Sequence, residues 1–167
     1  MIPKIEDLSK LVANTKTNTQ KLFTKLKRTQ PGSLDATVQR IHEDVFSEMN
    51  CLTCANCCKT TSPIFYQKDI ERLSKHFRIK PSQFIQNYLH IDADQDFVLN
   101  ATPCPFLGDD NFCSVYESRP TACREYPHTN RKRFYQLLDL TQKNTAVCPA
   151  AFEIVERLKK NYQNKSH

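Results

Sequence analysis

The stretch CLTCANCC, residues 51–58, places four cysteines within eight positions and ends with two adjacent ones. Cys51, Cys54 and Cys57 follow one another with two residues between them, a spacing that lets short turns of backbone present several sulfur atoms to one metal ion. Thiolates are strong, soft ligands for zinc and for the iron of iron–sulfur clusters. Packing alone rarely produces three cysteines at this spacing, so the stretch predicts a metal site.

Cys58 directly follows Cys57, and the side chains of adjacent residues usually diverge. Both thiolates are therefore not expected to bind one mononuclear ion easily. Two alternatives follow: Cys58 serves a second metal, or it is buried as a small apolar side chain.

The other four cysteines are spread along the second half of the chain and can reach one site only through folding. Together the eight sulfur atoms would suffice for two four-sulfur sites, or for one cluster with spare thiols. The candidate metal ligands are Cys51, Cys54, Cys57, Cys58, Cys104, Cys113, Cys123 and Cys148.

The identity of the metal stays open between zinc and iron. Cys104-Pro105 and Cys148-Pro149 are similar to the Cys-Pro pair of bacterial ferredoxins, which favours iron in an iron–sulfur cluster. Structural zinc sites use the same spacing of two residues, and the ferredoxin interval of three residues before the last cysteine is absent.

Charged and imidazole side chains lie near the candidate ligands. Lys59, Arg119 and Arg124 are each within four residues of a cysteine and could stabilise negative thiolates. The alternative for Arg119 and Arg124 is that they bind loop carbonyl groups. His128, five residues after Cys123, is a further candidate ligand or proton donor.

Composition limits the classes of function. The chain of 167 residues fits one domain with a helical extension, and 39% hydrophobic residues allow a modest core. The sequence contains only two glycines, Gly32 and Gly108, which excludes a dinucleotide fingerprint and a Walker-type phosphate loop. It shows neither an apolar run suited to a membrane span nor a signal-like start, so we expect a cytoplasmic protein whose thiols stay reduced.

The positive charge is concentrated at the start of the chain. Residues 1–30 hold seven Lys or Arg and two acidic residues, a net charge of +5 out of +6 for the whole chain. Such a face can attract nucleic acid or acidic lipid, but a solvated helix surface is the commoner explanation. In NRKRFYQ, residues 130–136, Phe134 and Tyr135 could stack on bases. The stretch is too short to predict nucleic-acid binding, which is kept as an alternative; no membrane partner is expected.

Apolar spacing predicts a mainly α-helical fold with irregular loops. Residues 5–26 and 34–49 form two helices of a hairpin, broken at Pro31 and Gly32, with Ser33 as the cap of the second helix. Further helices are predicted over 66–77, 81–89 and 149–163, with an acidic turn at 92–96, a strand at 97–101, a short helical turn from Pro120, and a helix or strand at 133–140. We expect two parts: a helical hairpin extension (1–50) and a small cysteine-rich metal-binding domain closed by the C-terminal helix (51–167).

The cysteine pattern as a whole resembles the YkgJ-type cysteine-cluster family, a zinc- or iron-chelating domain. The resemblance rests on CLTCANCC, on CPFLGDDNFCSVYESRPTACREYP (104–127) and on the final Cys148-Pro149. It covers about residues 51–149 and implies a metal ion as partner, with all eight cysteines as candidate ligands.

A more distant resemblance, to the flagellin lysine methylase FliB, implies methyl transfer from S-adenosylmethionine as an alternative function, and an iron–sulfur redox protein is another. The chain is short and has neither a glycine-rich cofactor loop nor a recognisable second domain. We therefore predict no catalytic residue, and cofactor-binding residues other than the metal ligands stay unknown.

Overall fold

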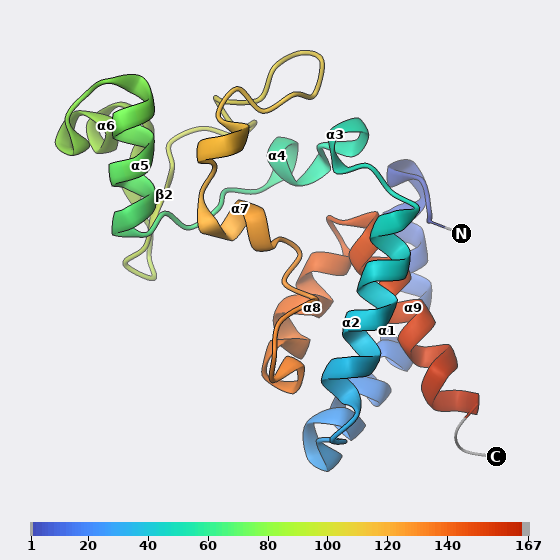
Figure 1. The fold of residues 1–167 in the computed structure, drawn as a ribbon. Coiled ribbons are helices and arrows are strands. Elements are labelled where there is room, and N and C mark those ends of the chain that lie inside the picture. Colours follow the sequence, from blue (N-terminus) through green and yellow to red (C-terminus); the bar gives the residue numbers. More distant parts are fainter. Residues whose placement is uncertain (1, 165–167) are drawn as a thin grey trace. The chain divides into compact units, whose positions relative to one another are not determined.

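The computed structural model describes residues 2–164, which fold into two compact units (Figure 1). The cysteine unit is Cys51–Tyr126, and the helical unit combines the residues up to Asn50 with those from Pro127 onward. The predicted mainly helical fold with irregular loops is confirmed, since the only named strands in the described residues are two of three residues each.

The first two helices form where the apolar spacing predicts them. Helix α1 spans Ile5–Thr29 and ends at Gln30, whose left-handed backbone lets its N–H donate to the Leu26 carbonyl at 2.9 Å. Pro31 follows, and α2 spans Leu34–Ser47. Ser33 was expected to cap α2, but its side chain makes no capping hydrogen bond to this helix.

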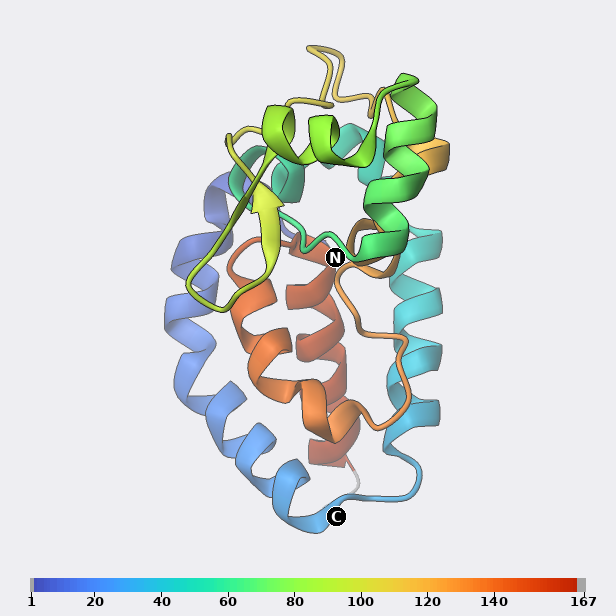
Figure 2. The same cartoon turned by 90° about the vertical axis from the view of Figure 1, so that its left-hand side faces the viewer.

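The C-terminal helix α9, Pro149–Asn164, packs against α1, α2 and α8 (Leu138–Thr145). Figure 2 shows it between α1 and α2. The sequence placed this helix in the cysteine domain, whereas the packing assigns it to the helical unit and so adds a second boundary after Tyr126. The physical reason is that α9 buries most of its circumference, including Ala150, Ala151 and Ile154, so it needs several helices around it.

The ambiguous stretch at 133–140 is helical: a 3₁₀ turn, η2 (Phe134–Leu137), leads into α8. The carboxylate of Asp35 accepts hydrogen bonds from the backbone N–H groups of Arg133 (2.7 Å) and Phe134 (2.9 Å), which fixes the start of η2 beside α2. Phe134 is completely buried. It is therefore not available to stack on bases, as the nucleic-acid alternative required.

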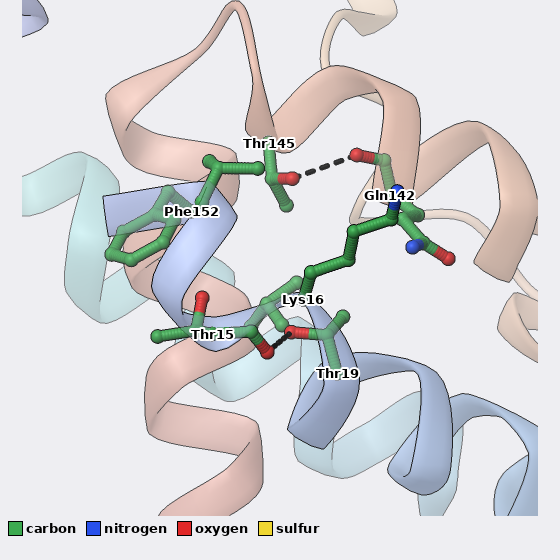
Figure 3. Close-up of a pocket in the computed structure, with 8 residues that line it drawn as sticks. Thr15, Lys16, Thr19, Gln142, Thr145 and Phe152 are labelled. Atoms are coloured by element: carbon green, nitrogen blue, oxygen red, sulfur yellow. Dashed lines mark hydrogen bonds between the residues drawn. The ribbon is translucent and has the colours of Figure 1, made fainter. Parts of the chain in front are cut away.

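A small cavity of about 20 Å³ lies between α1, α8 and α9 (Figure 3). It has room for about one water molecule. The hydroxyls of Thr19 and Thr145 at its wall donate to the carbonyls of Thr15 and Gln142. The cavity is part of helix packing and is too small for a substrate. Among the helices described for residues 2–164, none is long and apolar enough to cross a membrane.

The cysteine unit has its own apolar core, built on α5 (Gln67–Phe77), α6 (Pro81–Tyr88) and the antiparallel strands β1 (Leu89–Ile91) and β2 (Phe97–Leu99). Leu89 pairs with Leu99, although the sequence placed Leu89 at the end of a helix. The buried side chains of this core are Phe65, Ile70, Leu73, Phe84, Leu89, Leu99, Phe106 and Val115. The remaining elements are short: α3 (Cys51–Cys54), α4 (Asn56–Thr60), η1 (Tyr116–Ser118) and α7 (Thr121–Glu125).

Asp35→Ala should lower the free energy of unfolding of the helical unit by about 1–2 kcal/mol, because two backbone donors at the start of η2 lose a charged acceptor. Urea unfolding followed by circular dichroism measures the change. The matched control is Asp44→Ala on the same helix, which removes only an exposed ion pair with Arg40 (3.6 Å) and should cost less than about 0.5 kcal/mol. Equal losses in the two variants would contradict this role of Asp35.

Candidate metal centre

Seven of the eight predicted ligands lie in the cysteine unit, and all eight cysteines are free thiols. The seven are Cys51 and Cys54 of α3, Cys57 and Cys58 of α4, Cys104 and Cys113 in loops, and Cys123 of α7. The fold thus gathers into one unit thiols that are up to 72 positions apart in sequence (123 − 51).

The CLTCANCC stretch folds as two short helices that meet at Ala55. This residue has a left-handed backbone (φ 48°) and is buried. Its N–H donates to the Cys51 carbonyl at 2.9 Å, and its own carbonyl accepts from the Lys59 N–H at 3.1 Å. Cys54 therefore ends one helix and Cys57 lies in the first turn of the next.

The vicinal thiols do not diverge. The Sγ atoms of Cys57 and Cys58 are 4.0 Å apart. In a tetrahedral zinc site with Zn–S bonds of about 2.3 Å, two sulfur ligands are about 3.8 Å apart. The observed separation is close to this value, so the expectation that adjacent side chains point apart is wrong for this pair.

Backbone hydrogen bonds tie the later cysteines to the first cluster. The Cys104 N–H donates to the Cys58 carbonyl at 2.8 Å, which joins segments 46 positions apart (104 − 58). Cys113 pairs with Leu107 in an isolated antiparallel bridge, so the loop that begins at Cys104 turns back on itself.

Gly108 makes this turn possible. Its N–H donates to the Phe112 carbonyl at 2.8 Å, and the Asp110 side chain accepts from the Phe112 N–H at 2.9 Å. A Cβ atom at position 108 would lie 2.7 Å from Asp110 Oδ1. Because glycine has no Cβ, the Asp110 carboxylate can occupy this space. The chain then turns back and leads to Cys113.

The sulfur atoms of the cysteine unit are close enough to influence one another's ionisation. Burial, with a smaller contribution from the negative charge of Cys58, raises the pKa of Cys104 to about 11 and that of Cys123 to about 12. Burial and then the charge of Cys54 and Cys58 raise the pKa of Cys51. Thiolates in this unit therefore repel one another, and a cation among them would relieve the repulsion.

Cys58 behaves differently from its neighbours. A hydrogen bond from the Cys57 thiol lowers the pKa of Cys58 to about 7, against the opposing effect of burial, and the charge of Lys59 lowers it too. Cys58 thus supplies a thiolate closer to neutral pH than Cys104 or Cys123 does.

Arg119 is a cation whose charge acts on several of the thiols. Its charge lowers the pKa of Cys51, Cys113 and Cys123. Its Nη1 also donates to the Tyr116 carbonyl at 2.6 Å, so it has both of the roles considered from the sequence. Arg124 donates from Nε to the Arg119 carbonyl at 3.1 Å, which agrees with the alternative of carbonyl binding.

The donor set fits zinc or iron in its chemistry, because all seven groups are sulfur. Across residues 2–164, no group of three or more His, Cys, Asp or Glu side chains is arranged to hold a metal ion as it stands. The thiols are partly exposed rather than locked in a packed core, apart from buried Cys148. Coordination of one ion by three or more of these thiols would therefore require them to move from the positions that they hold here.

Cys148 and His128 lie in the helical unit. Cys148 is buried at the start of α9, where its Sγ accepts a hydrogen bond from the Ala151 N–H at 3.4 Å. His128 adopts a left-handed backbone (φ 66°) in the loop that follows α7. Ligand roles for these two residues stay predictions from the sequence.

Sequence reasoning missed two residues that bind the segment before Cys123, Asp69 and Arg72 of α5. Asp69 is a completely buried carboxylate that accepts hydrogen bonds from Thr121, two residues before Cys123. For Asp69 the sequence offered one signal: it is the third residue of its helix, where an acidic side chain is typical of the N-terminal turn. The partner across the unit was not visible in the sequence.

In the metal-free protein, Cys58 should be alkylated by iodoacetamide in a reaction that rises through about pH 7, well before Cys104 and Cys123 react. Cys57→Ala removes the thiol that stabilises the Cys58 thiolate, so the pKa of Cys58 and its labelling midpoint should move to higher pH. Mass spectrometry of labelled peptides across a pH series measures both. Cys54→Ala is the control and should leave the Cys58 midpoint near its original value; equal rates for Cys58 and Cys104 would refute the prediction.

Comparison with protein-family models gives a match over residues 50–149 to the CxxCxxCC family, described as "Putative zinc- or iron-chelating domain". The match covers CLTCANCC and ends just after Cys148, as the resemblance in the sequence indicated. The relation to FliB is not tested by this match. Comparisons with curated proteins and with solved structures returned no match. Because the family model covers more than half of the chain, the protein belongs to the CxxCxxCC family.

Proposed function

We propose that this protein binds zinc or iron through the thiolates of its cysteine unit, and that coordination orders the segments that carry them. The observation that carries the proposal is the gathering of seven free thiols, whose charges act on one another, in a single unit. The membership of the CxxCxxCC family supports the same chemistry.

Apolar packing does little to hold the cysteine-bearing segments in place. Within the described chain, α3, α4, η1 and α7 contain no buried residue, whereas α5 and α6 supply much of the apolar core. Little apolar burial means little hydrophobic stabilisation of these segments. Coordination by thiolates can contribute on the order of 10 kcal/mol in small zinc domains, enough to order such loops.

The charge around the thiols suits this role. Four thiolates around a divalent ion would leave two negative charges in excess, and charge-assisted donors close by stabilise such a site. Arg119 acts on Cys51, Cys113 and Cys123, and Lys59 acts on Cys58. These two cations would stabilise a thiolate site through their charge, without binding the metal themselves.

A sulfur-only donor set serves zinc and iron–sulfur clusters alike, so elemental analysis decides between them. The full chain purified without oxygen should contain at least one equivalent of zinc or iron. An iron–sulfur cluster, which would indicate the redox alternative, should give a brown protein whose visible absorption is bleached by dithionite. A chain that contains neither metal and takes up neither when it is added would overturn the proposal.

Single Cys→Ser variants test the ligand set. Cys54→Ser and Cys123→Ser should lower metal affinity by at least about tenfold, because each removes a thiolate that a hydroxyl does not replace. Competition with a chromophoric chelator measures the affinity. Cys148→Ser tests the ligand predicted in the helical unit: a matching loss would support an eight-cysteine set, and an unchanged affinity would restrict the ligands to the cysteine unit.

Metal removal should affect the two units differently. Amides of α3, α4 and α7 should exchange hydrogen much faster after chelation, because these segments lose the interaction that orders them. Amides of α2 and α9, which belong to a packed helical core, should keep their protection. Hydrogen exchange with mass spectrometry, before and after chelation and after zinc is restored, gives both results; equal exchange of α3, α4 and α7 in all three states would contradict an ordering role.

A further inference from the structure

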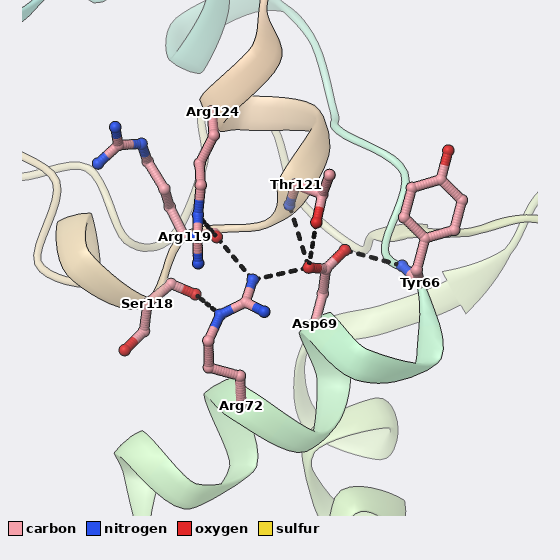
Figure 4. A network of polar contacts seen from close by, with 7 residues as sticks. All are labelled: Tyr66, Asp69, Arg72, Ser118, Arg119, Thr121 and Arg124. Atoms are coloured by element: carbon pink, nitrogen blue, oxygen red, sulfur yellow. Dashed lines mark hydrogen bonds and ion pairs between the residues drawn. The ribbon is translucent and has the colours of Figure 1, made fainter.

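The carboxylate of Asp69 is completely buried and is surrounded by donors (Figure 4). Its Oδ2 accepts from the Tyr66 N–H at 3.1 Å. Its Oδ1 accepts from Arg72 Nη2 at 2.6 Å, and from the backbone N–H (3.0 Å) and hydroxyl (2.9 Å) of Thr121. One side chain of α5 thus holds the first residue of α7.

Arg72 extends the same contact along the chain. Its Nη2 also donates to the Arg119 carbonyl at 2.8 Å, and its Nε donates to the Ser118 carbonyl at 3.1 Å. Between them, Asp69 and Arg72 bind polar groups of Ser118, Arg119 and Thr121. This segment enters α7 and is therefore fixed to α5 at three nearby residues.

The pair is more than an arbitrary surface contact. Burial by itself would raise the pKa of Asp69, but hydrogen bonds from Arg72, Tyr66 and Thr121 outweigh it and keep the carboxyl ionised. Buried ion pairs often stabilise a fold no better than apolar side chains of similar size would, and the best-attested reason to keep one is that it fixes one arrangement.

The fixed segment carries two members of the candidate centre. Cys123, one of the candidate ligands, lies two residues after Thr121 in the first turn of α7, and its N–H donates to the Pro120 carbonyl at 3.0 Å. Arg119 lies two residues before Thr121, and its guanidinium acts on the thiols. A shift of this segment would move a sulfur donor and a neutralising cation together.

We propose that Asp69 and Arg72 are positioning residues of the metal centre: by fixing Ser118–Thr121 to α5, they hold Cys123 and Arg119 where coordination needs them. Neither residue is a ligand. The inference rests on the proposed function and adds to it a residue pair that raises metal affinity by reducing the reorganisation of the thiols on binding.

The first test compares zinc affinity of the full-length wild type with that of Asp69→Asn, by competition with a chelator. Asparagine keeps the shape but loses the charge and presents an amide donor to groups that are themselves donors. We expect affinity to fall about 10- to 100-fold, as for other partners just outside a coordination sphere, with the zinc stoichiometry at saturation unchanged. Affinity equal to that of the wild type would overturn the inference and leave the proposed function intact; a wild type that binds neither zinc nor iron would overturn both.

A double-mutant cycle tests the route through Cys123. Asp69→Asn should weaken zinc binding less in a Cys123→Ser background than in a Cys54→Ser background, because the positioned sulfur is already missing in the first. Cobalt(II) supplies an independent readout, since its thiolate charge-transfer bands should lose intensity in Asp69→Asn at subsaturating metal. Equal effects of Asp69→Asn in the two backgrounds would overturn the proposed route.

Two further variants separate positioning from stability. Ile70→Val shortens a completely buried neighbour on α5 without touching the carboxylate, and its zinc affinity should stay close to the wild-type value. If Asp69→Asn fails to fold, Thr121→Val removes one of its hydrogen bonds, with Thr121→Ser as the conservative partner that restores it. Zinc binding that is weakened in Thr121→Val and recovered in Thr121→Ser supports the inference. The inference is contradicted if Ile70→Val loses as much zinc affinity, for each kcal/mol of folding stability that it loses, as Asp69→Asn or Thr121→Val does.

Discussion

Partly buried thiols ionise with difficulty, and this is the constraint on which the cysteine unit depends: burial disfavours the thiolate most, and neighbouring thiolates add to the effect. Burial and the charge of Cys58 raise the pKa of Cys104 and Cys123, so these thiols ionise with difficulty when no cation is present. The fold meets this constraint with cationic side chains, with Arg119 held over the Tyr116 ring at 3.7 Å. The metal ion of the proposed function would meet it more strongly, because a metal accepts the sulfur electrons directly.

Much of the helical framework could be predicted from the sequence. The spacing of apolar residues identified α1, α2, α5, α6 and α9, since one buried face leaves a periodic trace in a helix. The partners of these helices could not be predicted in the same way. Periodicity shows that a face is buried but not against what, and α9, which the sequence grouped with the cysteine domain, contacts α1, α2 and α8. Strand β1 was missed because three residues are too few for an alternating pattern to appear.

The candidate site was predictable to the extent that its chemistry is local. Three cysteines with two residues between each pair are recognisable as metal ligands from the sequence, and the family resemblance extended the set of candidate ligands to all eight cysteines. The contact between Asp69 and Thr121 joins residues 52 positions apart, and neither residue type is unusual where it stands. Phe134 illustrates the opposite error, because aromatic and basic residues side by side suggested an exposed surface while the ring completes the helical core.

The cysteine unit interrupts the helical unit, whose helices come from both ends of the chain. During synthesis, α1 and α2 leave the ribosome about 100 residues before α9, a delay of roughly 5–20 s at common translation rates. Their apolar faces, with Leu26 and Val38 among them, stay uncovered for that time. The apolar faces of α1 and α2 are thus open to aggregation and to chaperones during the same interval in which the cysteine unit is synthesised.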